Sequence, residues 1–164
     1  LLYVKGRFKS LLISSDGEKY SPEGIEEALV EKSPYIDQVM LYNNQSNYTT
    51  AVIVPNRDQL IRTLKVQGLD LSTEDGRKAA LTILDGEINK YKKGGDFEGM
   101  FPERWLPTCF AVLSEPFTEQ NQMINSTMKM VRGKIEKAYA ERIAYMYTAA
   151  GKQLHNQQNI DALK

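Results

Sequence analysis

The chain has few residues of the kinds that bind metals or form cross-links, with one cysteine and one histidine among 164 residues. A single thiol, Cys109, excludes a disulfide within the chain and favours a reducing compartment. Because Cys109 lies in an apolar, strand-like run, we expect an unreactive thiol in the core. One cysteine and one histidine cannot supply a set of zinc ligands, so we expect no metal site. We expect His155, in a polar segment, to lie on the surface.

The chain also lacks an excess of either charge and any long hydrophobic run. Its 21 Lys and Arg residues balance 21 Asp and Glu, whereas a dedicated nucleic-acid-binding protein normally carries a basic excess. The longest apolar runs, such as 51–54 and 110–113, are far too short to cross a bilayer. The first residues resemble neither a signal peptide nor a transit peptide. We therefore expect a cytoplasmic protein that has no transmembrane segment and binds no nucleic acid.

The common local motifs of nucleotide binding are absent too. The sequence contains neither the Gly-x-x-x-x-Gly-Lys-Ser/Thr loop nor the Gly-x-Gly-x-x-Gly pattern. Two charged clusters have a simple structural interpretation, as solvent-exposed faces of helices. These are the acidic cluster Glu23, Glu26, Glu27 and Glu31 and the basic cluster Lys129, Arg132, Lys134 and Lys137.

What the sequence does contain is a succession of short strands and helices. We expect strands at 2–4 and 8–13, a tight turn at Asp16-Gly17, and a helix that Ser21 caps and Pro22 begins. Later patterns predict strands at 36–42, 48–55 and 108–113, a polar loop at 43–47, helices after Asn56 and Ser72, and a helix from Met128 to about Gly151. The sequence therefore predicts an α+β fold, with a small N-terminal β-hairpin and then a roughly three-stranded sheet flanked by helices.

Two motifs, in the right order along the chain, resemble those of a known superfamily. The first runs from Gly6-Arg7-x-Lys9 to Gly17-Glu18-x-x-Ser21-Pro22-Glu23-x-Ile25-Glu26 and resembles the hinge signature of the adenylate-forming enzymes. The second, Ile124-Asn125-Ser126-Thr127-Met128-Lys129-Met130-Val131-Arg132, resembles the Leu-Thr-Pro-Thr-x-Lys-x-x-Arg motif of the long-chain fatty acid–CoA ligase branch. Pro55-Asn56 and the helical insertion before Trp105 are also similar to that branch. The likeness extends from about Leu1 to Tyr139.

The resemblance implies that residues 1–150 are the mobile C-terminal lid domain of such an enzyme, hinged near Lys9, with a polar tail at 151–164. The large N-terminal adenylation domain would be its partner and is absent from this chain, so we expect the isolated chain to be inactive. Full-length members use ATP to convert a fatty acid to acyl-AMP, releasing pyrophosphate, and transfer the acyl group to coenzyme A, releasing AMP. ATP and Mg²⁺ would be bound mainly by the N-terminal domain. A fatty-acid substrate could bring the full-length enzyme to the inner membrane surface.

The resemblance also implies roles for individual residues. Lys129 matches the catalytic lysine of the adenylation step, and Lys9 matches the hinge residue about which the lid rotates. Arg7 would contact the nucleotide, and Arg132 would support the lysine. The loop of Ser15, Asp16, Gly17 and Glu18 would line the passage for the pantetheine arm of coenzyme A. No metal ligand is implied for this chain.

Two alternatives stay open. The enzyme could pass its acyl group to an acyl carrier protein, or could be another acid–CoA ligase of the same superfamily, such as an aryl-CoA ligase. The chain could instead be a freestanding α+β interaction module whose basic helix, from Lys129 to Arg142, docks a partner.

Overall fold

The computed structural model describes residues 10–164, and the predicted strand at 2–4 and the predicted roles of Arg7 and Lys9 lie outside them. Its central sheet has the strand order β3-β5-β6, formed by β3 (Ile36–Tyr42), β5 (Thr49–Pro55) and β6 (Pro107–Val112). Strands β3 and β5 are antiparallel, and β6 runs parallel to β5. All three strands lie where the sequence predicts them.

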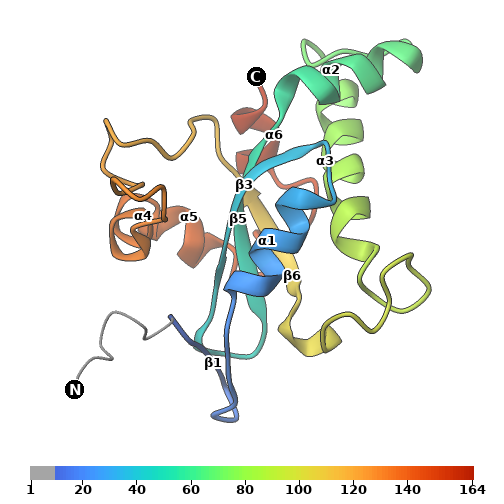
Figure 1. Cartoon of the computed structure of the whole chain (residues 1–164). Helices are drawn as coiled ribbons and strands as arrows, with labels where there is room; N and C mark the ends of the chain where they lie inside the picture. Colours follow the sequence, from blue (N-terminus) through green and yellow to red (C-terminus); the bar gives the residue numbers. More distant parts are fainter. Residues whose placement is uncertain (1–9) are drawn as a thin grey trace.

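A second, smaller sheet lies at one end of the domain (Figure 1). It has the order β2-β1-β4, formed by β1 (Leu12–Ser14), β2 (Lys19–Tyr20) and β4 (Asn44–Ser46). The β1–β2 pair is antiparallel, whereas β4 runs parallel to β1. The segment 43–47, predicted as a plain loop, therefore supplies a strand to this sheet.

Within residues 10–164, seven helical segments complete an α+β fold, as predicted. They are α1 (Glu23–Glu31), α2 (Arg57–Val66), α3 (Glu74–Asn89), the 3-10 helix η2 (Glu103–Trp105), α4 (Arg132–Ala138), α5 (Ala140–Tyr145) and α6 (Gln157–Ala162). None of the helices within residues 10–164 combines the length and the apolar character that a membrane crossing requires.

The central sheet separates two hydrophobic cores, because successive side chains of a strand point to opposite faces. Val39 and Leu41 belong to the core that α1, α2, α3 and α6 cover, whereas Met40 belongs to the core under α4 and α5. Figure 1 shows α3 and α4 on opposite sides of the sheet. Cys109 is buried in the second core, as predicted, and burial raises its pKa to about 11.

The start of α1 differs from the prediction. The helix begins at Glu23, and Pro22 occupies the N-cap position that the sequence assigns to Ser21. The Ser21 hydroxyl donates to Glu23 Oε1 at 2.8 Å and caps no backbone group. Ile25 and Leu29 face the core as predicted, but Glu26 is buried too, so the expectation that it belongs to a solvated face is wrong.

The long helix predicted from Met128 to Gly151 is also wrong. Met128 has a positive φ of 65°, α4 begins only at Arg132, and Tyr139 separates α4 from α5 with φ −114° and ψ 26°. Ile135 and Ile143, one on each helix, both insert into the second core. Because α4 and α5 are separate helices, each can be oriented so that its isoleucine points to the same face of the central sheet. A single straight helix would fix the two directions relative to each other.

Residues 151–164, predicted as a polar tail, are an integral part of the fold. Asn156 caps α6 by accepting from the backbone N–H of Asn159 at 2.9 Å. Ile160 and Leu163 are buried in the first core. The side chain of Asn159 is buried against β6, where its Oδ1 accepts from Val112 N at 2.9 Å and its Nδ2 donates to Phe110 O at 3.0 Å. His155 is exposed, as expected, and its ring lies 3.1 Å from the carbonyl of Lys78.

Candidate functional site

A groove of about 710 Å³ lies between α1, β3 and the loop that precedes α4. Lys129, Arg132 and Ser10 all line it, although they come from opposite ends of the chain. Ser10 directly follows the predicted hinge residue Lys9. The residue after the predicted hinge and the predicted catalytic lysine therefore line the same groove. The remaining polar wall is largely acidic and comprises Glu23, Glu26, Glu27, Glu31, Asp37 and Gln38.

The predicted catalytic lysine ends a tight turn, Asn125–Lys129, which we call the lysine loop. The Asn125 carboxamide oxygen accepts from the backbone N–H groups of Thr127 and Lys129, both at 3.0 Å. The Asn125 N–H donates to the Lys129 carbonyl at 2.9 Å, which closes the turn. An asparagine at this position thus holds the loop backbone with its own side chain, as Asx turns do.

The lysine loop joins the core through the residues on either side of it. Ile124 and Met130 form an antiparallel bridge, and the N–H of Val131 donates to Met123 O at 2.8 Å. Ile124 is buried in the second core. The Lys129 side chain is exposed, and within residues 10–164 no carboxylate lies at ion-pairing distance from its ammonium group. The loop therefore presents a free cation on a fixed backbone.

Arg132, the first residue of α4, forms a buried ion pair with Glu26 of α1. Its Nη1 donates to Glu26 Oε2 at 2.9 Å, and its Nη2 donates to Glu26 Oε1. Glu26 Oε2 also accepts from the N–H of Leu41 on β3 at 2.7 Å. The side chains are only 14% and 5% exposed. Burial alone would lower the pKa of Arg132, but the hydrogen bonds and charge of Glu26 raise it, so the guanidinium stays charged.

The predicted coenzyme A loop, Ser15–Glu18, is the turn between β1 and β2, which we call the hairpin loop. Gly17 has φ 90°, a value that a residue without Cβ adopts readily. Asp16 Oδ1 accepts from the Ser14 hydroxyl and from the N–H of Glu18, the latter at 3.1 Å. The Ser14 hydroxyl is the main cause of the lowered pKa of Asp16. These local bonds hold the turn in one shape.

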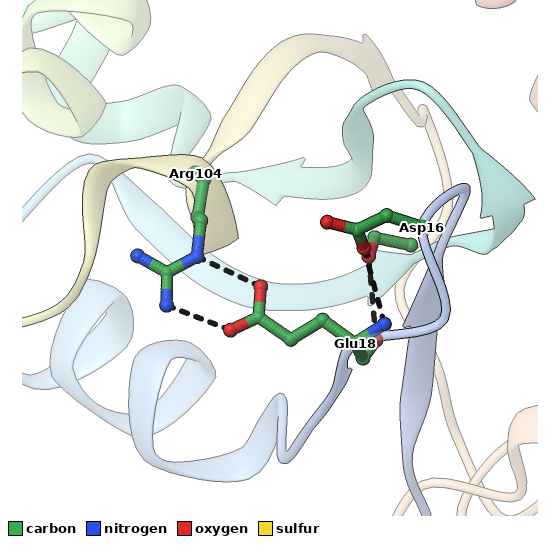
Figure 2. A network of polar contacts seen from close by, with 4 residues as sticks. Asp16, Glu18 and Arg104 are labelled. Atoms are coloured by element: carbon green, nitrogen blue, oxygen red, sulfur yellow. Dashed lines mark hydrogen bonds and ion pairs between the residues drawn. The ribbon is translucent and has the colours of Figure 1, made fainter.

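Glu18 carries an ion pair that the sequence did not indicate. Figure 2 shows Arg104 of η2 reaching across to Glu18, with Nε–Oε1 at 2.8 Å and Nη2–Oε2 at 2.7 Å. Hydrogen bonding to Arg104 lowers the pKa of Glu18, and Glu18 raises that of Arg104. Next to this pair, Trp105 stacks on Tyr20 with ring centroids 5.3 Å apart. The hairpin loop is thus tied to the segment before β6.

The fold brings Lys129 and Arg132 together but keeps them apart from the hairpin loop. None of the four residues Ser15–Glu18 lines the groove. In Figure 1, β1 lies at the lower end of the domain, and α4 lies on its flank. Two separate surfaces therefore carry the two sets of predicted site residues. The sequence did not identify Glu26 or Arg104 as functional residues, because the ion-pair partner of each is distant in the chain. The only signal was the position of Glu26 directly after the apolar residue Ile25, which could have indicated that Glu26 is buried.

Metal binding finds no support in the part of the chain that the structure describes. Among residues 10–164, no three His, Cys, Asp or Glu side chains lie together in an arrangement that could hold a metal ion. The carboxylates of Glu18 and Glu26 are each engaged by an arginine.

Comparison with known proteins gives consistent results. No family model matches the chain. It is 25% identical over 155 residues to the probable acyl-activating enzyme 16 of Arabidopsis thaliana, with 90% of this chain and 20% of that protein covered. It is 24% identical to a long-chain-fatty-acid–CoA ligase of Xenopus laevis, with 94% of this chain and 23% of that protein covered. The chain thus spans only about a fifth of the length of these relatives.

Solved structures match the fold as well. The adenylation and carrier didomain of a carboxylic acid reductase from Segniliparus rugosus, in complex with AMP, superposes with a TM-score of 0.64 at 25% identity. The match covers 85% of this chain and 17% of that one. The adenylation domain of a carboxylate reductase from Mycobacterium chelonae gives the same TM-score at 24% identity, with 84% of this chain and 19% of that one covered.

Proposed function

We propose that this chain belongs to the adenylate-forming superfamily and is the mobile C-terminal domain of a long-chain fatty acid–CoA ligase. The observation that carries the proposal is the presentation of Lys129. Its ammonium group, which has no ion-pair partner among residues 10–164, extends from a turn fixed by Asn125. It lies in the groove that also holds Ser10, the residue after the proposed hinge Lys9. Such a group can be delivered to an active site elsewhere in the enzyme and withdrawn again.

The proposed reaction has two steps. In the first, a carboxylate oxygen of the fatty acid bonds to the α-phosphorus of ATP, and the bond from that phosphorus to the β-phosphate oxygen breaks. Acyl-AMP and pyrophosphate result. In the second, the sulfur of coenzyme A bonds to the acyl carbon, AMP leaves, and the thiol releases its proton. The acyl chain and ATP would be bound by the larger part of the enzyme, so the isolated chain should be inactive.

Lys129 would act in the first step. Negative charge gathers on the phosphate oxygens in that transition state, and a positioned cation stabilises it more than it stabilises the bound substrates. Lysine suits this role because its ammonium is a compact charge on a flexible stem. Arg7 would contact the nucleotide. Arg132 would support the lysine rather than bind phosphate, because Glu26 already accepts from both of its terminal nitrogens.

The hairpin loop would act in the second step. Rotation about Lys9 would exchange the surface that faces the active site, and the hairpin loop and the lysine loop lie on different parts of the domain. Ser15, Asp16, Gly17 and Glu18 would then line the passage for the pantetheine arm. Gly17 suits close approach, since beyond its two chain neighbours no described atom lies within 4 Å of the position where a Cβ would be.

Mg²⁺ would accompany ATP, and we assign none of its ligands to this chain. The described residues offer no ligand cluster for it, so every step proposed here uses this chain's own residues. A fatty-acid substrate would bring the enzyme, which we infer to be cytoplasmic, to the inner membrane surface.

The acyl acceptor is the point on which the relatives differ. One relative, 24% identical over 148 residues, is a long-chain-fatty-acid–[acyl-carrier-protein] ligase of Arabidopsis thaliana. We favour coenzyme A because several other relatives are named as acyl-CoA ligases or synthetases. Supplying the full-length protein with coenzyme A or carrier protein as acceptor would distinguish the two.

The test of the proposed function is ATP–pyrophosphate exchange by the full-length protein with a series of fatty acids. We expect exchange that depends on a long-chain acid and falls about 100- to 1,000-fold in Lys129→Ala, the usual effect of losing a transition-state donor. Thioester formation from supplied acyl-AMP should change little. Lys137→Ala, an exposed lysine on α4 outside the groove, is the matched control. Unchanged exchange in Lys129→Ala would refute the role assigned to Lys129, and absence of exchange in the wild type would favour the interaction module.

A further inference from the structure

We infer that Glu26 is a positioning residue for adenylation, which acts on Lys129 through its ion pair with Arg132. The inference rests on the proposed function of Lys129. The residue lies on α1, far from the lysine loop in sequence, and its carboxylate is reached by three donor groups, two from Arg132 and one from the Leu41 backbone. It is therefore a fixed acceptor on the core side of the groove.

Glu26 is held rigidly by the elements around it. Its neighbours on α1, Ile25 and Leu29, are buried in the first core, so the helix cannot rotate without exposing them. The hydrogen bond from Leu41 N at 2.7 Å ties the same carboxylate to the edge of β3. An acceptor fixed to both a helix and a strand defines a single position for the guanidinium that pairs with it.

Arg132 transmits this position to the lysine loop. It lies three residues after Lys129, and the segment between them is bridged back to Met123 and Ile124. Asn125 fixes the other end of the turn. The lysine loop is therefore held on one side by Ile124 in the second core and on the other by the Glu26–Arg132 pair. Without the pair, the side toward α4 loses its only ionic attachment within the described residues.

The ion pair cannot be a latch between two orientations of the domain. Both partners belong to the same domain and lie in one buried cluster, so a rotation about the proposed hinge would move them together. Arg132 is also poorly placed to touch phosphate, since its two terminal nitrogens face Glu26 and its side chain is only 14% exposed. The remaining role is to set the direction in which Lys129 points.

This role should affect one half-reaction. The hairpin loop does not line the groove that Glu26 and Arg132 line, and it is held by its own pair, Glu18–Arg104. In the full-length protein, we expect Glu26→Gln to slow acid-dependent ATP–pyrophosphate exchange by about 10- to 100-fold, the effect of misplacing a catalytic group by about 1 Å. The loss should appear in kcat rather than in the KM for ATP. Thioester formation from supplied acyl-AMP should stay within about twofold of the wild type.

Two further variants separate positioning from simple loss of structure. Arg132→Gln should slow exchange as much as Glu26→Gln, and the double variant should be no slower than either, because residues that act as a unit are not additive. Arg132→Lys keeps the charge but not the two-pronged geometry and should recover part of the rate. Glu141→Gln, an exposed carboxylate on α5, removes the same charge elsewhere and should leave both half-reactions unchanged.

Several results would overturn the inference. An equal loss of both half-reactions in Glu26→Gln would mean that the pair only maintains the fold. Unchanged exchange would mean that Lys129 needs no such support, and additive losses in the double variant would mean that Glu26 acts by another route. Absence of acid-dependent exchange in the wild-type protein would instead refute the proposed function itself.

Discussion

Replacing Asn159 by alanine should destabilise the domain strongly, although the residue lies in a segment with the composition of a polar tail. The Asn159 side chain is 1% exposed, and its amide makes four hydrogen bonds. Two are to the backbone of β6, namely from Val112 N at 2.9 Å and to Phe110 O at 3.0 Å. The variant would leave both of these backbone groups buried without a partner.

The magnitude follows from these two groups. A buried backbone group left unpaired costs about 1–3 kcal/mol. Alanine gains roughly 0.5 kcal/mol over asparagine within a helix, which offsets part of the loss. We therefore expect Asn159→Ala to lower the free energy of unfolding by about 1.5–5.5 kcal/mol, which for a chain of this size corresponds, near the middle of that range, to a fall in Tm of roughly 10 °C.

Urea unfolding followed by far-UV circular dichroism would measure the change. Gln158→Ala is the matched control, because Gln158 is exposed on the same turn of α6 and should alter stability by less than about 0.5 kcal/mol. A loss below about 1 kcal/mol in Asn159→Ala, with the control unchanged, would show that water replaces the amide at β6. It would refute the view that α6 is required by the fold.

Two other predictions concern the hairpin loop and the core thiol. Arg104→Ala should release Glu18, and we expect slower thioester formation from supplied acyl-AMP with ATP–pyrophosphate exchange unchanged; the reverse pattern would remove the hairpin loop from the second half-reaction. The Cys109 thiol, with a pKa of about 11, should carry only about 0.1% thiolate at pH 8. A disulfide reagent should therefore label Cys109 slowly in native protein and rapidly in urea, and rapid native labelling would contradict its burial.

The central sheet could be predicted from the sequence because its signals are local. Strands β3, β5 and β6 are runs of β-branched and apolar residues, and α2 has both a capping asparagine at Asn56 and a terminating glycine at Gly68, with φ 75°. The sequence also singles out Lys129, because a motif surrounds it, and its catalytic role stays a prediction. These features depend on a few neighbouring residues and not on what packs against them.

The features that the sequence did not indicate all depend on distant partners. Glu26 is adjacent to Ile25 on α1. Burying its charge would be costly without a partner, and that partner is Arg132 of α4, which is distant in the sequence. Tyr139 is not a helix-breaking residue, so the division between α4 and α5 had no local signal, although Ile135 and Ile143 both pack in the second core. The apolar residues of α6 are too few to show a helical period.

The side chains of Glu26 and Asn159 also lie at the two edges of the central sheet. Strands β3 and β6 are the outer strands, and each presents backbone groups that a strand of another chain could pair with. Glu26 occupies the N–H of Leu41 on β3, and Asn159 occupies the N–H of Val112 on β6. At the outer edges of both β3 and β6, a side chain therefore occupies a backbone group with which an added strand would pair. The central sheet is therefore protected at both edges from pairing with a strand of a neighbouring copy.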